Sequence, residues 1–422
     1  MGNQTSSLQE YKLQEAYRIE NIMKEKRFQF AFRCLDDIMK INPKENIVFS
    51  PSCIYKALLI IYIMVKDDIE KRLQNILLLT EISKQDLINY SDFTTISTIA
   101  SVDHINIPHY SQDVRCFIKP NIRLHQQSFP FMFSSVSNLN LFENSECLIN
   151  YINNKVLKKA VNDYFCDTSS LTVVKQDTEF VLMTSITGRF KKFQDSAAAA
   201  VDSPDVESLI DAQKISYFYE NLSMYVNEYF YEHRNISLFV LRPASLISGK
   251  CRISNYKNSR SNIRVLVEQL LTSDGFSELH KVLDRSAPLL GEVETLLTEH
   301  NLLPKFEVEK DLTMRELLQG LGAEQLLMPD AIFMDPSTVK GILPVVCFGN
   351  VMHRSQVKVT QKDISASAIT LIHSGLETSS GIEIDQNDFG HPFIWLIYDK
   401  FRREILFIGA FNKFTSAASC SR

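Results

Sequence analysis

The sequence predicts one large α+β domain. Segments with helical periodicity and segments with strand-like alternation are interleaved, without the regular alternation of doubly wound folds. No Gly/Ser-rich or Pro-rich linker divides the chain, and no internal repeat is found. The 422 residues are 45% hydrophobic and 23% charged, which is ordinary globular composition and enough to bury a sizeable core.

The N-terminal elements begin with a polar stretch, for which we expect a flexible tail over residues 1–21. A helical stripe follows, and Asn42 and Pro43 interrupt it. A short strand over residues 46–49 then leads to a nearly continuous apolar helix, which we expect in the middle of the molecule. Ser50 is its predicted N-cap and Pro51 its first residue. The helical stripe consists of Phe28, Phe32, Leu35 and Met39.

The middle of the chain alternates between both kinds of element. After the strand over residues 302–309, the sequence DLTMRELLQGLGAE predicts a short helix with a capping box at Thr313 and Glu316 and a stop at Gly322. The other expected strands cover residues 94–102, 179–187, 223–230 and 236–241, and the other expected helices cover 147–158, 257–272 and 288–299.

The C-terminal stretch from Met352 to Phe411 has an unusual order. A strand (MHRSQVKVT) leads into a track of small residues and a polar segment, and two apolar strands (HPFIWLIY and EILFIGAF) follow, joined by the turn DKFRR. Side chains alternate along a strand. The track could therefore lie between two strands of a sheet as well as in solvent. One side would carry Ile364, Ala366, Ala368 and Thr370, and the other Asp363, Ser365, Ser367 and Ile369.

Composition and charge exclude several classes of protein. A formal net charge of -5 argues against a general nucleic-acid binder. The longest apolar run, Ala57 to Val65, is far shorter than the roughly 20 residues of a membrane-spanning helix. The N-terminus lacks the apolar core of a secretory signal peptide, so an intracellular location is expected, with an extracellular one as the alternative.

The first residues, MGNQTS, also fit the pattern of an N-terminal acylation site. Gly2 would be exposed after removal of Met1, and Ser6 stands at the required position. An acyl chain there would provide weak membrane anchoring. The alternative interpretation is that these residues are only a polar tail.

Signatures of catalysis and of metal binding are missing. The sequence contains no nucleophile elbow, zinc-protease helix, phosphate-binding loop or dinucleotide-binding glycine motif. His104 and His109 are close in sequence, but no third ligand accompanies them. We therefore expect no enzyme, no cofactor and no metal. Eight scattered cysteines without a C-x-x-C pair favour free thiols: Cys34, Cys53, Cys116, Cys147, Cys166, Cys251, Cys347 and Cys420.

Three ordered segments resemble the serpin family. NIVFSPSCIYKALLIIY is similar to the family's shutter strand and helix, LLPKFEVEKDLTMRELLQGLGAEQLL to its central block, and HPFIWLIYDKFRREILFIGAF to its C-terminal hairpin. The resemblance implies a single serpin domain over residues 22–415, followed by a flexible tail over 416–422. It also implies three β-sheets, about eight to nine helices, an exposed reactive-centre loop and a monomer.

The resemblance further implies a serine protease inhibitor of the suicide-substrate type. A target protease cleaves the loop, which then inserts into the large sheet while the protease is still acylated. The insertion-facing residues are uncharged, as insertion requires. Asp363 and Ile364, however, stand where inhibitory members carry glycine and threonine, which would slow insertion. The alternative is a non-inhibitory serpin that acts as a binding module. The implied hinge comprises Asp363, Ile364, Ser365, Ala366, Ser367, Ala368 and Thr370.

Two further sites follow from the same resemblance. Ser50 and His353 match the family's shutter, whereas Cys53 and Thr184 replace its usual serine and asparagine, which would weaken the hydrogen-bond cluster there. Counting from the hinge places the cleavable bond near Glu377 and Thr378, with Leu376 or His373 as other candidates. The same segment could also be an exposed polar loop with no role as bait.

Overall fold

The computed structural model describes most of the expected elements. The described residues are 2–65, 67–90, 110–118, 180–192, 214–231, 235–247, 250–253, 259–284, 305–312, 314–327, 350–373, 383–387 and 392–412. The predicted helices over 147–158 and 288–299 lie outside these residues, as do the predicted strand over 94–102, His104 and His109.

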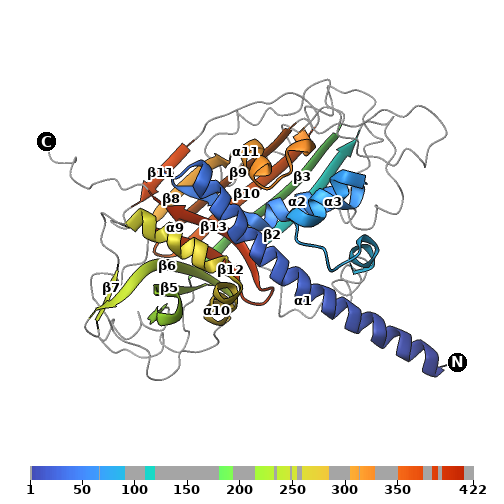
Figure 1. The fold of residues 1–422 in the computed structure, drawn as a ribbon, viewed down its shortest axis with the longest axis horizontal. Coiled ribbons are helices and arrows are strands. Elements are labelled where there is room, and N and C mark those ends of the chain that lie inside the picture. The colour runs from blue at the N-terminus through green and yellow to red at the C-terminus, as the bar shows by residue number, and fades with distance from the viewer. Residues whose placement is uncertain are drawn as a thin grey trace.

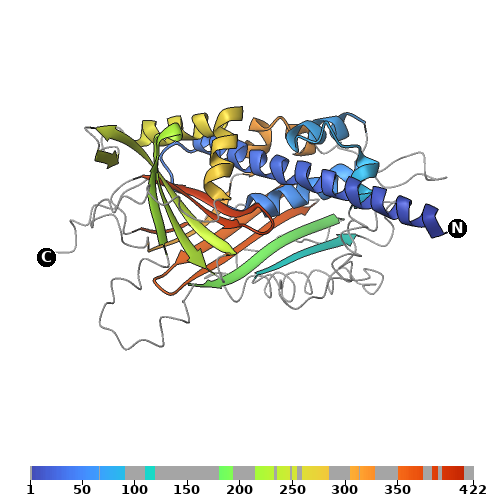
Figure 2. The ribbon, with the colours of Figure 1, turned by 90° about the horizontal axis from the view of Figure 1, so that it is seen from below.

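The described helices gather on one side of the strands (Figure 2). The predicted helix over 257–272 is confirmed as α9, and the one over 311–324 as α11, which ends near Gly322, a residue with a positive φ of 80°. The predicted cap Thr313 lies outside the described residues. The helices are α1 (Gly2–Ile41), α2 (Pro51–Met64), α3 (Asp67–Ile76), η6 (Glu220–Leu222), α9 (Ser259–Leu270), α10 (Ser273–Leu283), α11 (Met314–Gly320) and η10 (Glu324–Leu327).

The N-terminal helix is longer than the sequence predicts. The sequence predicts a flexible tail over residues 1–21, whereas in the structure α1 is continuous from Gly2 and its first turns project beyond the rest of the described chain (Figure 1). No glycine or proline interrupts residues 3–42. Ala16, Ile19 and Met23 are buried. Packing therefore holds the helix from about Ala16 onward, which includes the last residues of the expected tail.

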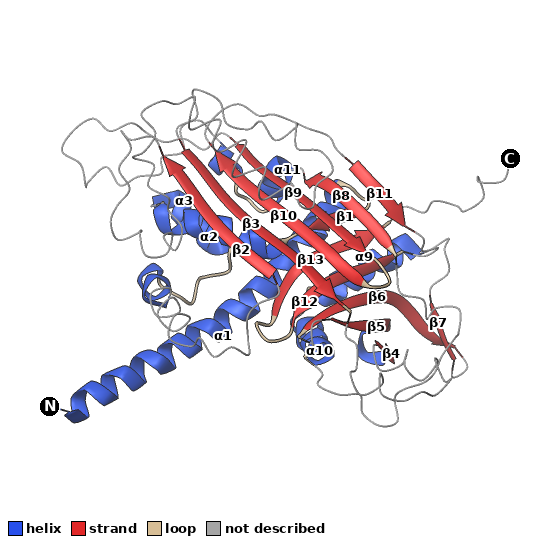
Figure 3. Cartoon of the chain, turned by 180° about the vertical axis from the view of Figure 1, so that it is seen from behind, coloured by secondary structure: helices blue, strands red, loops and turns tan. Residues whose placement is uncertain are grey.

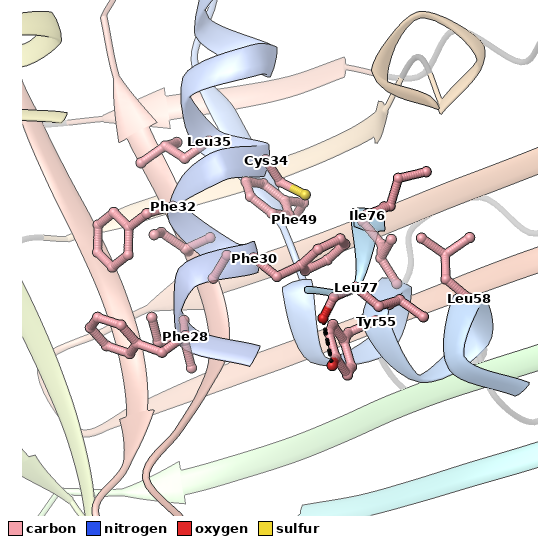
Figure 4. Packing of buried hydrophobic residues seen from close by; sticks show 14 of the residues in the cluster. Phe28, Phe30, Phe32, Cys34, Leu35, Phe49, Tyr55, Leu58, Ile76 and Leu77 are labelled. Atoms are coloured by element: carbon pink, nitrogen blue, oxygen red, sulfur yellow. Dashed lines mark hydrogen bonds between the residues drawn. The ribbon is translucent and has the colours of Figure 1, made fainter. Parts of the chain in front are cut away.

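The first core lies between α1, α2 and the sheet strands beneath them. Ser50 caps α2 as predicted, since its hydroxyl accepts a hydrogen bond from the Cys53 amide at 3.2 Å. Nearly every residue of α2 is buried, and Figure 4 shows aromatic and aliphatic side chains of α1 and α2 facing one another. The Tyr55 hydroxyl donates to the backbone oxygen of Leu77 at 3.1 Å, which satisfies its polar end inside this core.

A six-stranded sheet forms one layer of the molecule (Figure 3). All neighbouring strands that the structure describes in it are antiparallel. In order across the sheet they are β11 (Glu383–Asn387), β8 (Phe306–Leu312), β9 (Asn350–Val359), β10 (Asp363–His373), β3 (Phe180–Lys191) and β2 (Tyr110–Ile118).

A second sheet of seven strands contains the C-terminal hairpin. The described residues thus form two sheets where three were expected, and the α+β class is confirmed. The strand order of the seven-stranded sheet is β1 (Ile47–Phe49), β13 (Glu404–Phe411), β12 (Phe393–Asp399), β6 (Ile236–Ile247), β5 (Met224–Tyr231) and β4 (Lys214–Tyr219). Strand β7 (Lys250–Ile253) pairs with the C-terminal end of β6.

A second core cluster joins the two sheets. The Phe306 ring of β8 lies 5.1 Å from the Trp395 ring and 5.0 Å from the Phe411 ring. Gly409 sits against this cluster, and a Cβ atom there would lie 2.2 Å from the Ile47 backbone oxygen and 2.6 Å from the Trp395 ring. Only glycine fits at that position without a shift of the neighbouring strand.

No described helix is both long and apolar enough to cross a membrane.

Candidate functional site

The predicted hinge segment is the strand β10, in the middle of the six-stranded sheet. All eleven of its residues pair with β3, and those from Ile364 to His373 also pair with β9. Figure 3 shows β10 between these two strands. The expectation of an exposed loop is therefore wrong for residues 363–373, which occupy a strand position. The sequence had left both arrangements open, and the small uncharged residues fit the interior of the sheet.

The predicted division of β10 into two faces is confirmed. Ile364, Ala366 and Ala368 are each at most 1% exposed and belong to the core cluster between the sheets. On the opposite face, Ser365 is half-buried and Ser367 is fully buried. The Ser367 hydroxyl has no hydrogen-bond partner among the described residues. One face of the strand thus contributes hydrophobic burial.

Asp363 begins the strand and is accommodated by two partners. Its carboxylate lies 2.7 Å from a guanidinium nitrogen of Arg189 on β3, and it accepts a hydrogen bond from the Thr360 hydroxyl at 2.7 Å. The Thr360 bond, assisted by Arg189, holds the pKa of Asp363 below its usual range. The Thr360 amide also donates to the Asp363 backbone oxygen at 2.9 Å, which closes the turn between β9 and β10.

Ser50 and His353, two of the predicted shutter residues, meet β10 at Thr370. The Ser50 amide donates to Nε2 of His353 at 3.1 Å, so the imidazole proton resides on Nδ1, 2.8 Å from the Thr370 hydroxyl. The Ser50 hydroxyl donates to the Leu406 backbone oxygen at 2.7 Å. Complete burial lowers the pKa of His353 to about 3, so the ring is neutral. This chain of hydrogen bonds ties α2, β9, β10 and β13 together.

Cys53 and Thr184, the other two predicted shutter residues, form their own pair. The Cys53 thiol donates to the Thr184 backbone oxygen at 3.0 Å, and the Thr184 hydroxyl donates to the Cys53 backbone oxygen at 2.9 Å. Burial raises the pKa of Cys53, which keeps the thiol protonated. Helix α2 and strand β3 are therefore still linked by hydrogen bonds at this position.

Most candidates for the cleavable bond lie beyond β10 in the sequence. Leu376, Glu377 and Thr378 lie outside the described residues. His373 ends β10, is 2% exposed and pairs with Val181 and Asn350, so a protease cannot reach it in this conformation. Gly2, the candidate acylation site, is the first residue of α1.

Three residues of the site were missed in the sequence. Thr370 was assigned to the insertion face but not to the His353 cluster, and Arg189 and Thr360 were not linked to Asp363. A signal for Thr370 did exist, because pairing outward from a turn after Thr360 places Thr370 opposite His353. Arg189 is 174 residues away from Asp363 in sequence and gave no such signal.

The comparisons with known proteins agree with this geometry. The family model described as "Serpin (serine protease inhibitor)" matches residues 25–414. Serine protease inhibitor 88Ea of Drosophila melanogaster is 22% identical over 401 residues, which cover 91% of this chain and 88% of the relative. Leukocyte elastase inhibitor of Bos taurus is 22% identical over 404 residues, covering 90% and 96%.

Solved structures show the same fold at lower identity. Cleaved Serpin 42Da superposes with a TM-score of 0.61 at 14% identity, covering 96% of this chain and 100% of that one. The thermophilic serpin tengpin, in the latent state, superposes with a TM-score of 0.60 at 17% identity, covering 92% and 98%. With a family model that spans nearly the whole chain and a central strand placed between β9 and β3, this protein is a distant member of the serpin family.

Proposed function

We propose that the chain inhibits serine proteases as a suicide substrate. The observation that supports this most is the position of residues 363–373 as a central strand, paired on both sides. In such a mechanism a protease attacks the segment after His373, and the acylated protease moves with the loop as it enters the sheet. Inhibition then depends on whether insertion is faster than deacylation.

The inserted strand supplies the driving force for trapping. It adds two hydrogen-bonded ladders and buries the side chains of Ile364, Ala366 and Ala368 in the core between the sheets. Each backbone hydrogen bond contributes about 0.5 to 1.5 kcal/mol net, so a strand of this length gains many kcal/mol on insertion. This gain is available only if the sheet opens between β9 and β3.

The unusual hinge residues are compatible with the inserted state. Ile364 is fully buried, and the Asp363 carboxylate is paired with Arg189 and hydrogen-bonded to Thr360. Their cost therefore falls on the rate of insertion, since a β-branched residue and an aspartate restrict the backbone more than glycine does. We expect a functional inhibitor with a substantial substrate fraction.

A non-inhibitory binding module is the second candidate. It is favoured by one observation, namely that β10 occupies the sheet although the chain is continuous. One of the similar structures is described as cleaved and another as being in the latent state. A chain that rests in this form would bind partners through other surfaces.

The two candidates are separated by incubation with serine proteases of basic, aromatic and small-residue specificity. Inhibition predicts a band on denaturing gels that contains both the 48.4 kDa chain and the protease and that survives boiling in SDS. A catalytically inactive variant of the same protease serves as the control and should give no such band. Cleavage anywhere in the segment that follows β10, with full recovery of protease activity, would refute the inhibitor and favour the binding module.

A further inference from the structure

A cavity of about 500 Å³ lies at the end of the six-stranded sheet, next to the turn that precedes β10. Its lining comes from two short stretches of chain, residues 305–307 at the start of β8 and residues 358–362 at the end of β9 and in the following turn. The two stretches are neighbours because Phe306 pairs with Val359 and Glu307 with Lys358. The size falls within the range of about 300 to 1,000 Å³ that is usual for small-molecule sites.

The alternation of side chains along β8 and β9 determines which groups line the cavity. Phe306 and Val359 belong to the core cluster between the sheets, where the Phe306 ring contacts Trp395. Their neighbours along the strands therefore project from the opposite face. The polar groups that line the cavity are Lys305, Glu307, Lys358, Thr360, Gln361 and Lys362.

The charges of these groups do not balance. Lys358 pairs with Glu307 at 2.7 Å, whereas the exposed Lys305 and Lys362 form no ion pair with any residue that the structure describes. Asp363, which follows Lys362 in the chain, is engaged by Arg189 and Thr360, and Lys362 acts on it only as a more distant charge. Three lysines against one glutamate leave two uncompensated positive charges around the cavity.

We propose that this cavity binds a compact polyanion that carries at least two phosphate or sulfate groups. Ammonium groups act as strong point charges toward tetrahedral oxyanions. The aliphatic stems of lysine side chains can lie along apolar surface, such as that of Phe306 and Val359 in the lining, while the ammonium groups face a ligand. Neither the shutter nor the hinge uses Lys305, Lys358 or Lys362, so the site goes beyond the inhibitory mechanism.

Binding there would favour the inserted form, a step that rests on the proposed function. The turn that carries Lys362 is closed by the hydrogen bond between Thr360 and Asp363, and the backbone oxygen of Lys362 accepts a hydrogen bond from the amide of Lys192, the residue that follows β3. Both bonds require β10 to lie in the sheet. A ligand that binds only this form at about a hundredfold excess over its Kd raises the ratio of inserted to open form about a hundredfold.

Isothermal titration of the full chain with inositol hexakisphosphate, and separately with inositol hexasulfate, tests the site. We expect binding of one molecule per chain in at least one arm, and the tighter arm identifies the preferred oxyanion. Lys305→Gln with Lys362→Gln should weaken the binding at least about tenfold, since each removes a charged hydrogen-bond donor. Lys71→Gln, an exposed lysine on α3, is the matched control and should bind like the wild type.

The outcomes separate the site from the mechanism. Absence of binding in both arms, or equal binding by the double variant and the wild type, overturns the proposed site, provided that thermal unfolding shows the double variant to be folded. Binding without any slowing of amide exchange in residues 363–373 leaves the site standing and overturns the coupling to insertion. Protease trapping is not needed for either measurement, so failure of the proposed function is recognised independently.

Discussion

Replacing Ala366 by glutamate should prevent insertion of β10 without disturbing the open chain. Ala366 is 1% exposed and its register partners are Gly188 on β3 and Val357 on β9, neither of which offers a cation. In the open form the same side chain would be in solvent. The substitution therefore acts on the inserted state alone.

The free-energy penalty for insertion of Ala366→Glu depends on whether the glutamate carboxylate is buried charged or protonated. Burying an uncompensated charge costs about 3 to 5 kcal/mol. The side chain can instead bind a proton, which costs about 3.7 kcal/mol at neutral pH for a carboxyl whose usual pKa is about 4.3. Either route gives a penalty of about 4 kcal/mol, equivalent to a loss of about a thousandfold in the insertion equilibrium.

Thermal unfolding of the loop-cleaved protein measures this penalty. For a chain of this length, about 4 kcal/mol lowers the Tm of the inserted form by about 4 °C or more. Ser365→Glu is the matched control, because Ser365 is half-buried on the other face and lies between Arg189 and Lys358. We expect it to stay within about 1 °C of the wild type. Equal Tm values for the cleaved Ala366→Glu, Ser365→Glu and wild-type proteins would refute the assignment of Ala366 to the buried face.

Three further predictions concern the hinge, the shutter and the C-terminal hairpin. Asp363→Gly with Ile364→Thr should raise the ratio of trapped to cleaved product on denaturing gels by speeding insertion, and an unchanged ratio would show that the hinge does not limit trapping. The pKa of His353 is about 3 in the folded protein, below its usual 6.5. The stabilisation by the neutral ring should therefore be fully present above about pH 6.5. As the pH drops from about 6.5 toward 3, the free energy of unfolding should fall by up to about 1.4 kcal/mol per pH unit. In denaturant titrations at a series of pH values, the free energy of unfolding of His353→Gln should depend less steeply on pH than that of the wild type. An equal dependence on pH would contradict a neutral ring bonded to Ser50. Gly409→Ala should cost about 2 to 3 kcal/mol in the same titrations because its Cβ would overlap the adjoining strand and ring, and a loss below about 0.5 kcal/mol would contradict that packing.

Much of the fold was predictable because local chemistry and tertiary structure agree. The cap at Ser50, the proline at the first position of α2 and the alternation along β10 each lead to one geometry. The extent of α1 was not predictable from its pattern. Its first turns are polar and carry only scattered apolar residues, and packing of Ala16 and Ile19 against the body decides their structure.

The site was predictable only in part, because its residues meet across large separations in sequence. The uncharged face of β10 could be recognised, since insertion demands it. The ion pair between Asp363 and Arg189 could not, because the pairing of β10 with β3 is fixed by the whole sheet and not by either segment. The same reason explains why Asp363 could be read only as a defect of the hinge until its partners were known.

The proposed inhibitory mechanism requires residues 363–373 to lie in the six-stranded sheet after cleavage of the loop. Hydrogen exchange followed by mass spectrometry on loop-cleaved wild-type protein measures that position directly. We predict that the amides of residues 364–372 exchange as slowly as those of β3 and β9, because each is bonded within a central strand. Exchange at the rate of an unstructured peptide, while β3 and β9 remain protected, would contradict insertion and with it the proposed mechanism.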